Sequence, residues 1–213
     1  MSVNIQRSPE WYSMRREHIG ASDAPVIMGV SPWKSIEELY HEKILGLEMP
    51  SNPKMERGIE LEEPARQLYT EMTGIQVKDK VVFHPFYNWM MASLDGMSVN
   101  NKRIMEIKVA GKVDHALAKK GKIPEKYYPQ LQHQMEVCRE LFGIDEMDYF
   151  SFNGKEGVIV NVKRDHVYIQ GMIEKELEFW NCLKRGIAPK ETYTREPSEF
   201  WTIEDEKKWI ESF

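Results

Sequence analysis

The stretch Ser93-Leu94-Asp95-Gly96, with Glu106-Ile107-Lys108 ten positions further on, decides how this sequence is interpreted. Side chains alternate along a strand, so Glu106 and Lys108 point to one face of a strand over 103–109, and Ile107 points to the other. A packed strand position is normally apolar, yet two opposite charges share one face here. Asp95 is expected to end the preceding strand, just before a glycine, where its carboxylate can lie beside Glu106 across the hairpin. The pattern predicts an acidic cluster with a lysine next to it.

The residue types in this cluster favour a hard metal ion and phosphate chemistry. Two carboxylates without a sulfur or histidine partner suit Mg²⁺, which prefers oxygen ligands. A lysine one strand step away can orient or deprotonate an attacking water and stabilise charge on a phosphate. The alternative is an ordinary Glu–Lys pair on an exposed face, which an isolated Glu-x-Lys motif would favour. The preceding Asp-Gly and the surrounding order of elements favour the metal site.

The hydrophobic pattern predicts one α/β domain over residues 1–213, with a mixed central sheet flanked by helices. The core is expected at 11–186, and 187–213 is expected to be an acidic, aromatic C-terminal appendage ending in a short helix. The order of elements is α-β-β-β-α-β-β-α after two short helical pieces. Those two pieces lie at 9–17 and 35–45. Longer helices are predicted at 56–73, from after Pro124 to Gly143 and at 166–185. Strands are predicted at 75–83, 89–99, 103–109, 147–152 and 157–163.

Two predicted helices carry polar residues on faces that should be buried. Glu62 lies at the shoulder of the apolar stripe of helix 56–73, and a carboxylate directed towards the core needs a cation. Pro64 complicates this position, because the helix could instead start near Glu62 or kink there, with the helix dipole favouring the acid. In the second helix Gln130 and Gln134 fall inside the apolar arc, while Gln132 and His133 fall outside it. A buried glutamine must be hydrogen-bonded, either to the backbone or towards the acidic cluster.

The composition argues against a membrane-spanning protein. Charged residues make up 30% of the chain, no apolar run of about 18 residues occurs, and the first residues lack the apolar stretch of a signal peptide. We therefore expect no membrane span and a cytoplasmic location, in a bacterial or phage-infected cell. Two cysteines, Cys138 and Cys182, are expected to be reduced thiols.

Charge is unevenly distributed along a chain whose formal net charge is −5. Between residues 102 and 126, eight basic residues face three acidic ones, which suggests a localised contact with phosphates or, as the alternative, a solvated lysine-rich face. The DNA-contact candidates in this window are Lys112, Lys119 and Lys120. Trp33, in a Ser-Pro-Trp-Lys turn, could wedge into DNA, but a buried aromatic residue at a turn is the expected role.

The acidic cluster and the order of elements resemble the core of the PD-(D/E)XK nuclease superfamily, whose fold is α-β-β-β-α-β. Further motifs are similar to those of the YqaJ-like and lambda exonuclease family of phage recombination nucleases. The similarity runs from about residue 11 to 180 and rests on Trp11…Arg15, Gly20-Ala-Ser22-Asp, Gly29-Val-Ser-Pro-Trp, Gly58…Glu62…Ala65, Ser93-Leu-Asp95-Gly and Tyr128-Pro-Gln130-Leu-Gln132.

The resemblance implies a role for each matching residue. Two metal ions, Mg²⁺ or Mn²⁺, would be held by Asp95, Glu106, the carbonyl of Ile107 and Glu62. Lys108 and Gln130 would be catalytic residues at the same centre, and Arg15 and Ser22 would anchor a terminal 5′-phosphate. Neither Pro64 nor His18 has a counterpart that the resemblance supplies.

The function implied is a Mg²⁺-dependent 5′→3′ exonuclease on linear double-stranded DNA. It would hydrolyse phosphodiesters by a two-metal mechanism and leave a 3′ single strand for recombination by annealing. The resemblance also implies a homotrimeric ring around DNA and a phage single-strand annealing protein as partner. The alternatives are a restriction-type or repair endonuclease on the same fold and a non-catalytic DNA-binding module. The non-catalytic DNA-binding module fits poorly, because carboxylates around Lys108 repel phosphate unless a metal intervenes.

Overall fold

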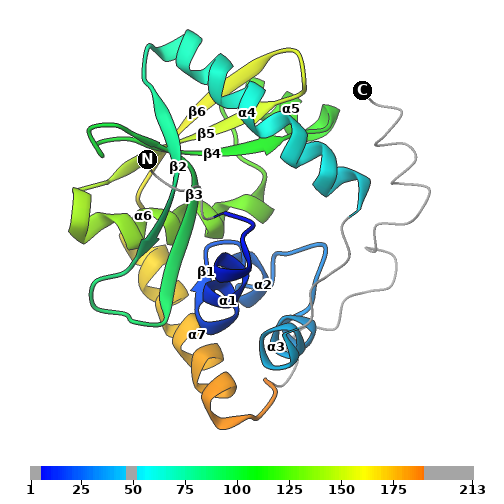
Figure 1. Cartoon of the computed structure of the whole chain (residues 1–213), viewed down its shortest axis with the longest axis vertical. Helices are drawn as coiled ribbons and strands as arrows, with labels where there is room; N and C mark the ends of the chain where they lie inside the picture. Colours follow the sequence, from blue (N-terminus) through cyan, green and yellow to red (C-terminus); the bar gives the residue numbers. More distant parts are fainter. Residues whose placement is uncertain (1–5, 47–51, 190–213) are drawn as a thin grey trace.

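A computed structural model describes residues 6–46 and 52–189 of the chain (Figure 1). Residues 190–213 lie outside this range, so the predicted short helix of the appendage is not tested, and residues 187–189 contain no helix or strand. The helices are α1 (Pro9–Glu17), α2 (Ala24–Ile27), α3 (Ile36–Leu45), α4 (Pro53–Thr73), α5 (Lys112–Lys119), the 3₁₀ turn η1 (Glu125–Tyr127), α6 (Tyr128–Phe142) and α7 (His166–Arg185). The strands are β1 (Ile19–Gly20), β2 (Val77–Phe83), β3 (Met90–Ser98), β4 (Ile104–Val109), β5 (Glu146–Phe152) and β6 (Gly157–Lys163).

The strands form one mixed sheet, as the sequence predicts. β3 pairs with β2 and β4 in antiparallel fashion and with the short β1 in parallel. β4 then pairs with β5 in parallel, and β6 closes the sheet antiparallel to β5. The pairing of β3 with β4 covers Gly96–Met105 and Met97–Ile104, so Asp95 and Glu106 are the next residues along the two strands.

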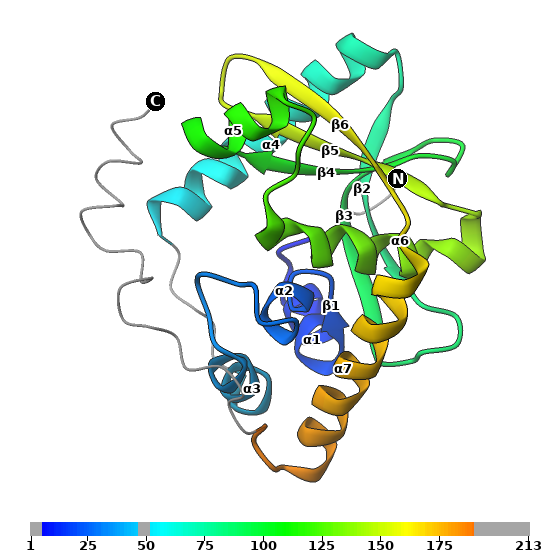
Figure 2. The same ribbon diagram turned by 180° about the vertical axis from the view of Figure 1, so that it is seen from behind.

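Helices cover both faces of the sheet (Figures 1 and 2). α4 packs on one face, where it contacts β4. α6 lies across the other face against β3, and α7 and α2 pack on α6. α5 covers the same face as α6 at β5 and β6, where its Ala118 joins the α6-side core cluster and its His115 hydrogen-bonds Ser151. Figure 2 shows α1, α2 and α3 gathered below the sheet, beside the C-terminal half of α7.

The core is divided between the two faces by the alternation of β4. Met105 and Ile107 pack with Ala65 and Tyr69 under α4. Ile104 packs in the larger cluster on the α6 side. Glu106 and Lys108 therefore point away from α4, and the prediction that they share a face opposite Ile107 is confirmed.

The structure corrects two local predictions and adds three short elements. Asp95 does not end its strand, because β3 continues to Ser98. α4 starts at Pro53 and runs through Pro64, so Glu62 lies in the middle of a helix and is not a helix-start acid. The sequence reading also missed the short elements β1, α2 and α5.

α6 is buried on a wider arc than its amphipathic pattern predicts. Gln132 and His133 were expected outside the apolar arc, yet both are fully buried. The reason is that α7 covers that side of the helix: His133 hydrogen-bonds Glu176 of α7 at 2.8 Å. Burial also raises the pKa of the Cys138 thiol to about 12, and both cysteines are free, as expected. Among the described residues, no helix is long and apolar enough to cross a membrane.

Candidate active site

The carboxylate of Glu106 is the centre of a buried polar cluster. Its side chain is held from the α6 side by two glutamines: Gln130 Nε2 donates to Oε1 at 2.5 Å, and Gln134 Nε2 donates to Oε2 at 2.5 Å. Lys108 Nζ donates to Oε1 at 2.7 Å. Glu106 itself is only 3% exposed. Three donors therefore hold one carboxylate, as a buried acid requires.

Asp95 joins this cluster from β3. Its Oδ2 accepts a hydrogen bond from the backbone N–H of Ile107 at 2.9 Å, which places the Ile107 backbone at the site. Burial, and then the charge of Glu106, raise the pKa of Asp95 well above its usual range. Burial alone would lower the pKa of Lys108, but the charges of Glu106 and Asp95 raise it, so the ammonium form is favoured.

Glu62 is buried, 8% exposed, and its carboxylate is paired with two arginine side chains. Arg66, one helical turn further along α4, and Arg7 from the N-terminal segment each form an ion pair with its carboxylate. Arg66 Nε also donates to the backbone carbonyl of Asp95 at 2.8 Å, so this arginine connects α4 to β3. The carboxylate thus has the cationic partners that its burial requires, and its role as a metal ligand stays a prediction. The sequence reading missed Arg66, although its i,i+4 spacing was a usable signal.

The donor chemistry of the cluster fits a hard divalent cation. Asp95, Glu106 and the Ile107 backbone offer only oxygen ligands. The charges of Glu106 and Glu62 both raise the pKa of Asp95, a repulsion that a cation would relieve. In the part of the chain that is described, no three carboxylate, imidazole or thiol groups converge as they stand. Glu62 would have to exchange an arginine for the ion.

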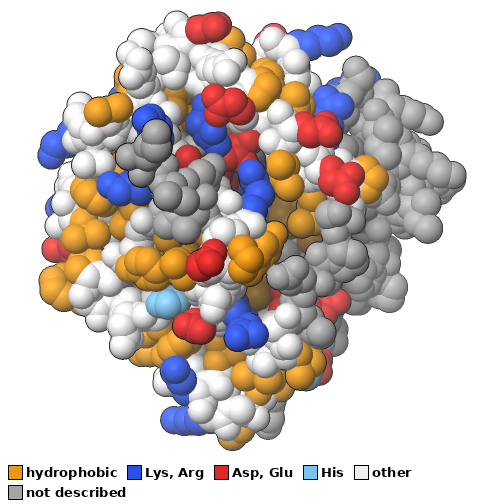
Figure 3. Space-filling model, in the orientation of Figure 1, with side chains coloured by type: hydrophobic (Ala, Val, Ile, Leu, Met, Phe, Trp, Pro, Cys, Tyr) orange, Lys and Arg blue, Asp and Glu red, His pale blue; other side chains and the backbone are white. Residues whose placement is uncertain are grey.

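Acidic and basic side chains also meet on the surface over this region. In Figure 3 they lie side by side near the middle of the face shown, between the parts that Figure 1 labels α4 and β3.

Arg15 and Ser22 are brought together as a pair. Arg15 Nη2 donates to Ser22 Oγ at 2.8 Å, and the guanidinium lies 4.6 Å from the centre of the Trp11 ring. Trp11 Nε1 donates in turn to Ser93 Oγ at 2.8 Å, two residues before Asp95 on β3. The pair is therefore joined to the strand that carries Asp95.

A buried ion pair supports the loop that carries Ser22. Asp23 accepts the backbone N–H of Gly20 at 2.8 Å and pairs with Lys43 Nζ at 2.5 Å. Burial would raise the pKa of Asp23, but Lys43 and then Arg15 hold it below its usual value. Lys43 also donates to the carbonyl oxygens of Arg15 and His18, so one lysine connects the end of α1 to Asp23, on the far side of Ser22.

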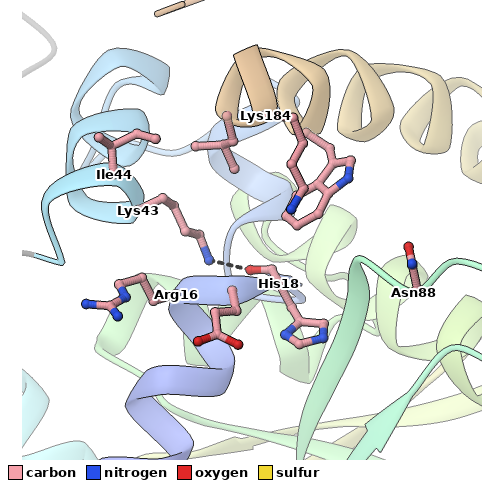
Figure 4. A pocket seen from close by; sticks show the side chains of 9 residues that line it. Arg16, His18, Lys43, Ile44, Asn88 and Lys184 are labelled. Atoms are coloured by element: carbon pink, nitrogen blue, oxygen red, sulfur yellow. Dashed lines mark hydrogen bonds between the residues drawn. The ribbon is translucent and has the colours of Figure 1, made fainter. Parts of the chain in front are cut away.

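The neighbouring Arg16 lies in a separate cavity. Figure 4 shows its side chain with those of His18, Lys43 and Lys184 around a space of about 480 Å³ between α1, α3 and the end of α7. The dashed line in the figure is the 2.7 Å bond from Lys43 to the carbonyl of His18. Arg15 does not line this cavity, so the two consecutive arginines have different surroundings.

The lysine-rich window is not one exposed strip. Arg103, Lys108 and Lys126 are engaged with Asp148, Glu106 and Asp114 respectively. The three DNA-contact candidates lie on or next to α5. Lys112 and Lys119 line a hollow of about 280 Å³ with Lys155, Lys120 is exposed at the helix end, and Lys119 is paired with Glu156.

Solved structures with the same architecture are known. The chain is similar to an alkaline exonuclease, LHK-Exo, from Laribacter hongkongensis, at 26% identity and a TM-score of 0.71 over 83% of this chain and 93% of that one. The same enzyme has been solved in complex with dAMP. A phage-related exonuclease from Haemophilus somnus, at 17% identity and a TM-score of 0.54, shares the fold over 79% of this chain and 92% of its own.

Sequence comparison gives the family. The chain is 32% identical to the protein YqaJ of Bacillus subtilis (strain 168) over 179 residues, 81% of this chain. It spans about half the length of that relative, 55%. Residues 10–140 match the family described as the YqaJ-like viral recombinase domain. This match covers more than half of the chain and contains every residue of the acidic cluster, and the chain belongs to the YqaJ-like viral recombinase domain family.

Proposed function

We infer that the protein is a metal-dependent exonuclease that degrades linear double-stranded DNA from the 5′ end. The observation that carries this proposal is the buried cluster of Asp95, Glu106 and Lys108, in which α6 supplies two glutamines to one carboxylate. The family and the likeness to an alkaline exonuclease that has been solved with dAMP support DNA as the substrate.

Asp95, Glu106, the carbonyl of Ile107 and Glu62 would hold the metal, Mg²⁺ or Mn²⁺, as two ions. A bound divalent cation would polarise a phosphoryl oxygen and make a bound water more acidic. Gln130 and Gln134 keep the Glu106 carboxylate in one orientation, since each holds one of its two oxygens. Lys108, 2.7 Å from the same carboxylate, can orient the attacking water or stabilise negative charge on the phosphate.

Arg15 and Ser22 would bind the terminal 5′-phosphate. A guanidinium offers a planar fork of donors that matches phosphate oxygens, and the serine hydroxyl adds another donor. Both groups are already within 2.8 Å of one another and are fixed through Trp11 to the strand of Asp95. A phosphate held there would set the distance from the DNA end to the bond that is cut, which is how an exonuclease differs from an endonuclease.

The exposed lysines around α5, Lys112, Lys119 and Lys120, would contact the DNA backbone. The homotrimeric ring and the single-strand annealing partner rest on the family resemblance. A ring whose channel alone meets DNA is compatible with an overall negative charge and a local group of lysines.

The test is cleavage of a linear duplex with one labelled 5′ end, in Mg²⁺ and in EDTA, next to a closed circle of the same sequence. We expect label to be released as short products from the linear DNA in Mg²⁺ only, while the circle stays intact. Cutting of the circle would replace the proposal with the endonuclease alternative. DNA binding without Mg²⁺-stimulated cleavage of either substrate would favour the non-catalytic module.

A further inference from the structure

Trp33 is a large aromatic side chain in an unexpected place. The sequence predicts a buried aromatic residue at the turn between α2 and α3, but the side chain is 52% exposed, so that prediction is wrong. Its ring stacks on Tyr127, with centroids 6.0 Å apart and an angle of 29° between the planes. An exposed tryptophan held flat against a second ring offers a rigid apolar surface to a ligand.

This surface is continuous with the catalytic cluster. Lys108 Nζ lies 5.1 Å from the centre of the Tyr127 ring, so Trp33, Tyr127 and Lys108 follow one another from the surface to Glu106. Lys126 Nζ lies 5.5 Å from the Trp33 ring and 5.2 Å from the Tyr127 ring, and it is also paired with Asp114 at 2.8 Å. The ammonium group of Lys126 therefore lies over both rings, and that of Lys108 lies over the inner one.

We propose that Trp33, supported by Tyr127, is the stacking surface for a nucleobase within the first nucleotides at the 5′ end of the strand that is cut. The inference rests on the proposed function, because it requires a DNA phosphate at Lys108. A nucleotide whose phosphate contacts Lys108 carries its base one sugar away, and the Trp33 ring is separated from Lys108 by the single ring of Tyr127. Stacking on an aromatic ring accepts any base, which suits an enzyme that must pass along every sequence.

The proposal is tested by a double-mutant cycle between protein and substrate. Linear duplexes carry an abasic nucleotide at the first, second or third position from the 5′ end, or none. Initial rates give kcat/KM for wild type and Trp33→Ala. On normal DNA, Trp33→Ala should lose about 5- to 150-fold, the range found for single stacked bases. Wild type should lose a similar factor at one abasic position. The two losses should not multiply, because the same contact is removed twice.

Control variants separate stacking from other effects. Trp33→Phe should keep most of the rate and Trp33→Leu should not, since only the first retains an aromatic face. Phe86→Ala removes a side chain that is 75% exposed in the turn between β2 and β3, and should leave all rates unchanged. Losses that multiply at all three positions would overturn the proposal while leaving the exonuclease intact. Wild type without activity on any substrate would instead reject the proposed function.

Discussion

Removing the guanidinium of Arg103 should weaken the fold rather than DNA binding. Asp148 on β5 is fully buried and accepts from Arg103 Nε at 2.7 Å and Nη2 at 3.0 Å. Tyr69 Oη donates to the same carboxylate at 2.6 Å. Burial, together with this hydrogen bond, raises the pKa of Tyr69 above its usual range, so the phenol stays a donor. In Arg103→Met, Asp148 keeps the tyrosine but loses its cation.

The expected cost follows from the burial of the two partners. Breaking a buried ion pair costs about 3–5 kcal/mol, because a charge is left without its partner. Arg103 is 38% exposed on its side chain, which lets water screen the pair, and Tyr69 remains bonded, so we expect about 2–3 kcal/mol. For a chain of this size the melting temperature should fall by about 5–10 °C.

Urea unfolding followed by circular dichroism measures the loss, with Lys102→Met as the matched control. Lys102 is an exposed neighbour in the same basic window and should change stability by no more than about 0.5 kcal/mol. The dependence of DNA affinity on salt should stay unchanged in Arg103→Met. An unchanged unfolding midpoint together with a shallower salt dependence of DNA affinity would refute the reasoning and would indicate that Arg103 contacts DNA.

Three further predictions concern the site. Lys108→Ala should slow cleavage by orders of magnitude with little change in DNA affinity. Lys120→Ala should instead weaken DNA binding and reduce the salt slope of the affinity by about one unit per lost phosphate contact. Equal effects of the two variants, on binding alone, would show that Lys108 takes no part in catalysis. Gln134→Leu should lower kcat more than it raises KM, because Glu106 loses one of its two amide donors. Gln134→Glu, which places a second acid beside Glu106, should lower kcat further. A normal kcat in both variants would show that this glutamine does not act at the site. Arg15→Ala should erase a preference for 5′-phosphorylated over 5′-hydroxyl duplex, and Arg16→Ala, which lines the separate cavity, should leave the preference intact; wild type that treats both ends alike would remove the end anchor.

The central features of the sheet could be predicted because they depend on local alternation. The positions of Glu106, Ile107 and Lys108 follow from the two-residue period of a strand. β1 has two residues and α2 four, so neither carries a period, and β1 exists through its pairing with β3. α5 was missed because the helix has only eight residues, of which only His115 and Ala118 are buried, so no apolar stripe marks it.

Partners distant in sequence explain the remaining errors. The cation that Glu62 requires was predicted, but Arg7 is 55 positions away and no local spacing identifies it. The burial of His133 depends on Glu176 of α7, 43 positions away. A helical pattern assumes one face towards solvent, and it fails where a second helix covers that face.

The rate of cleavage by Glu106→Gln tests the central claim most directly. The substitution keeps the volume of the side chain but removes the charge that two glutamines and Lys108 hold in place. On 5′-labelled linear duplex in Mg²⁺, we predict a rate at least about 100-fold below wild type, as loss of a metal ligand at the reacting centre requires. Its thermal melt should remain cooperative, and Asp95→Asn should behave alike. Near-normal cleavage by both variants would contradict the account, because the chemistry would then lie elsewhere in the protein.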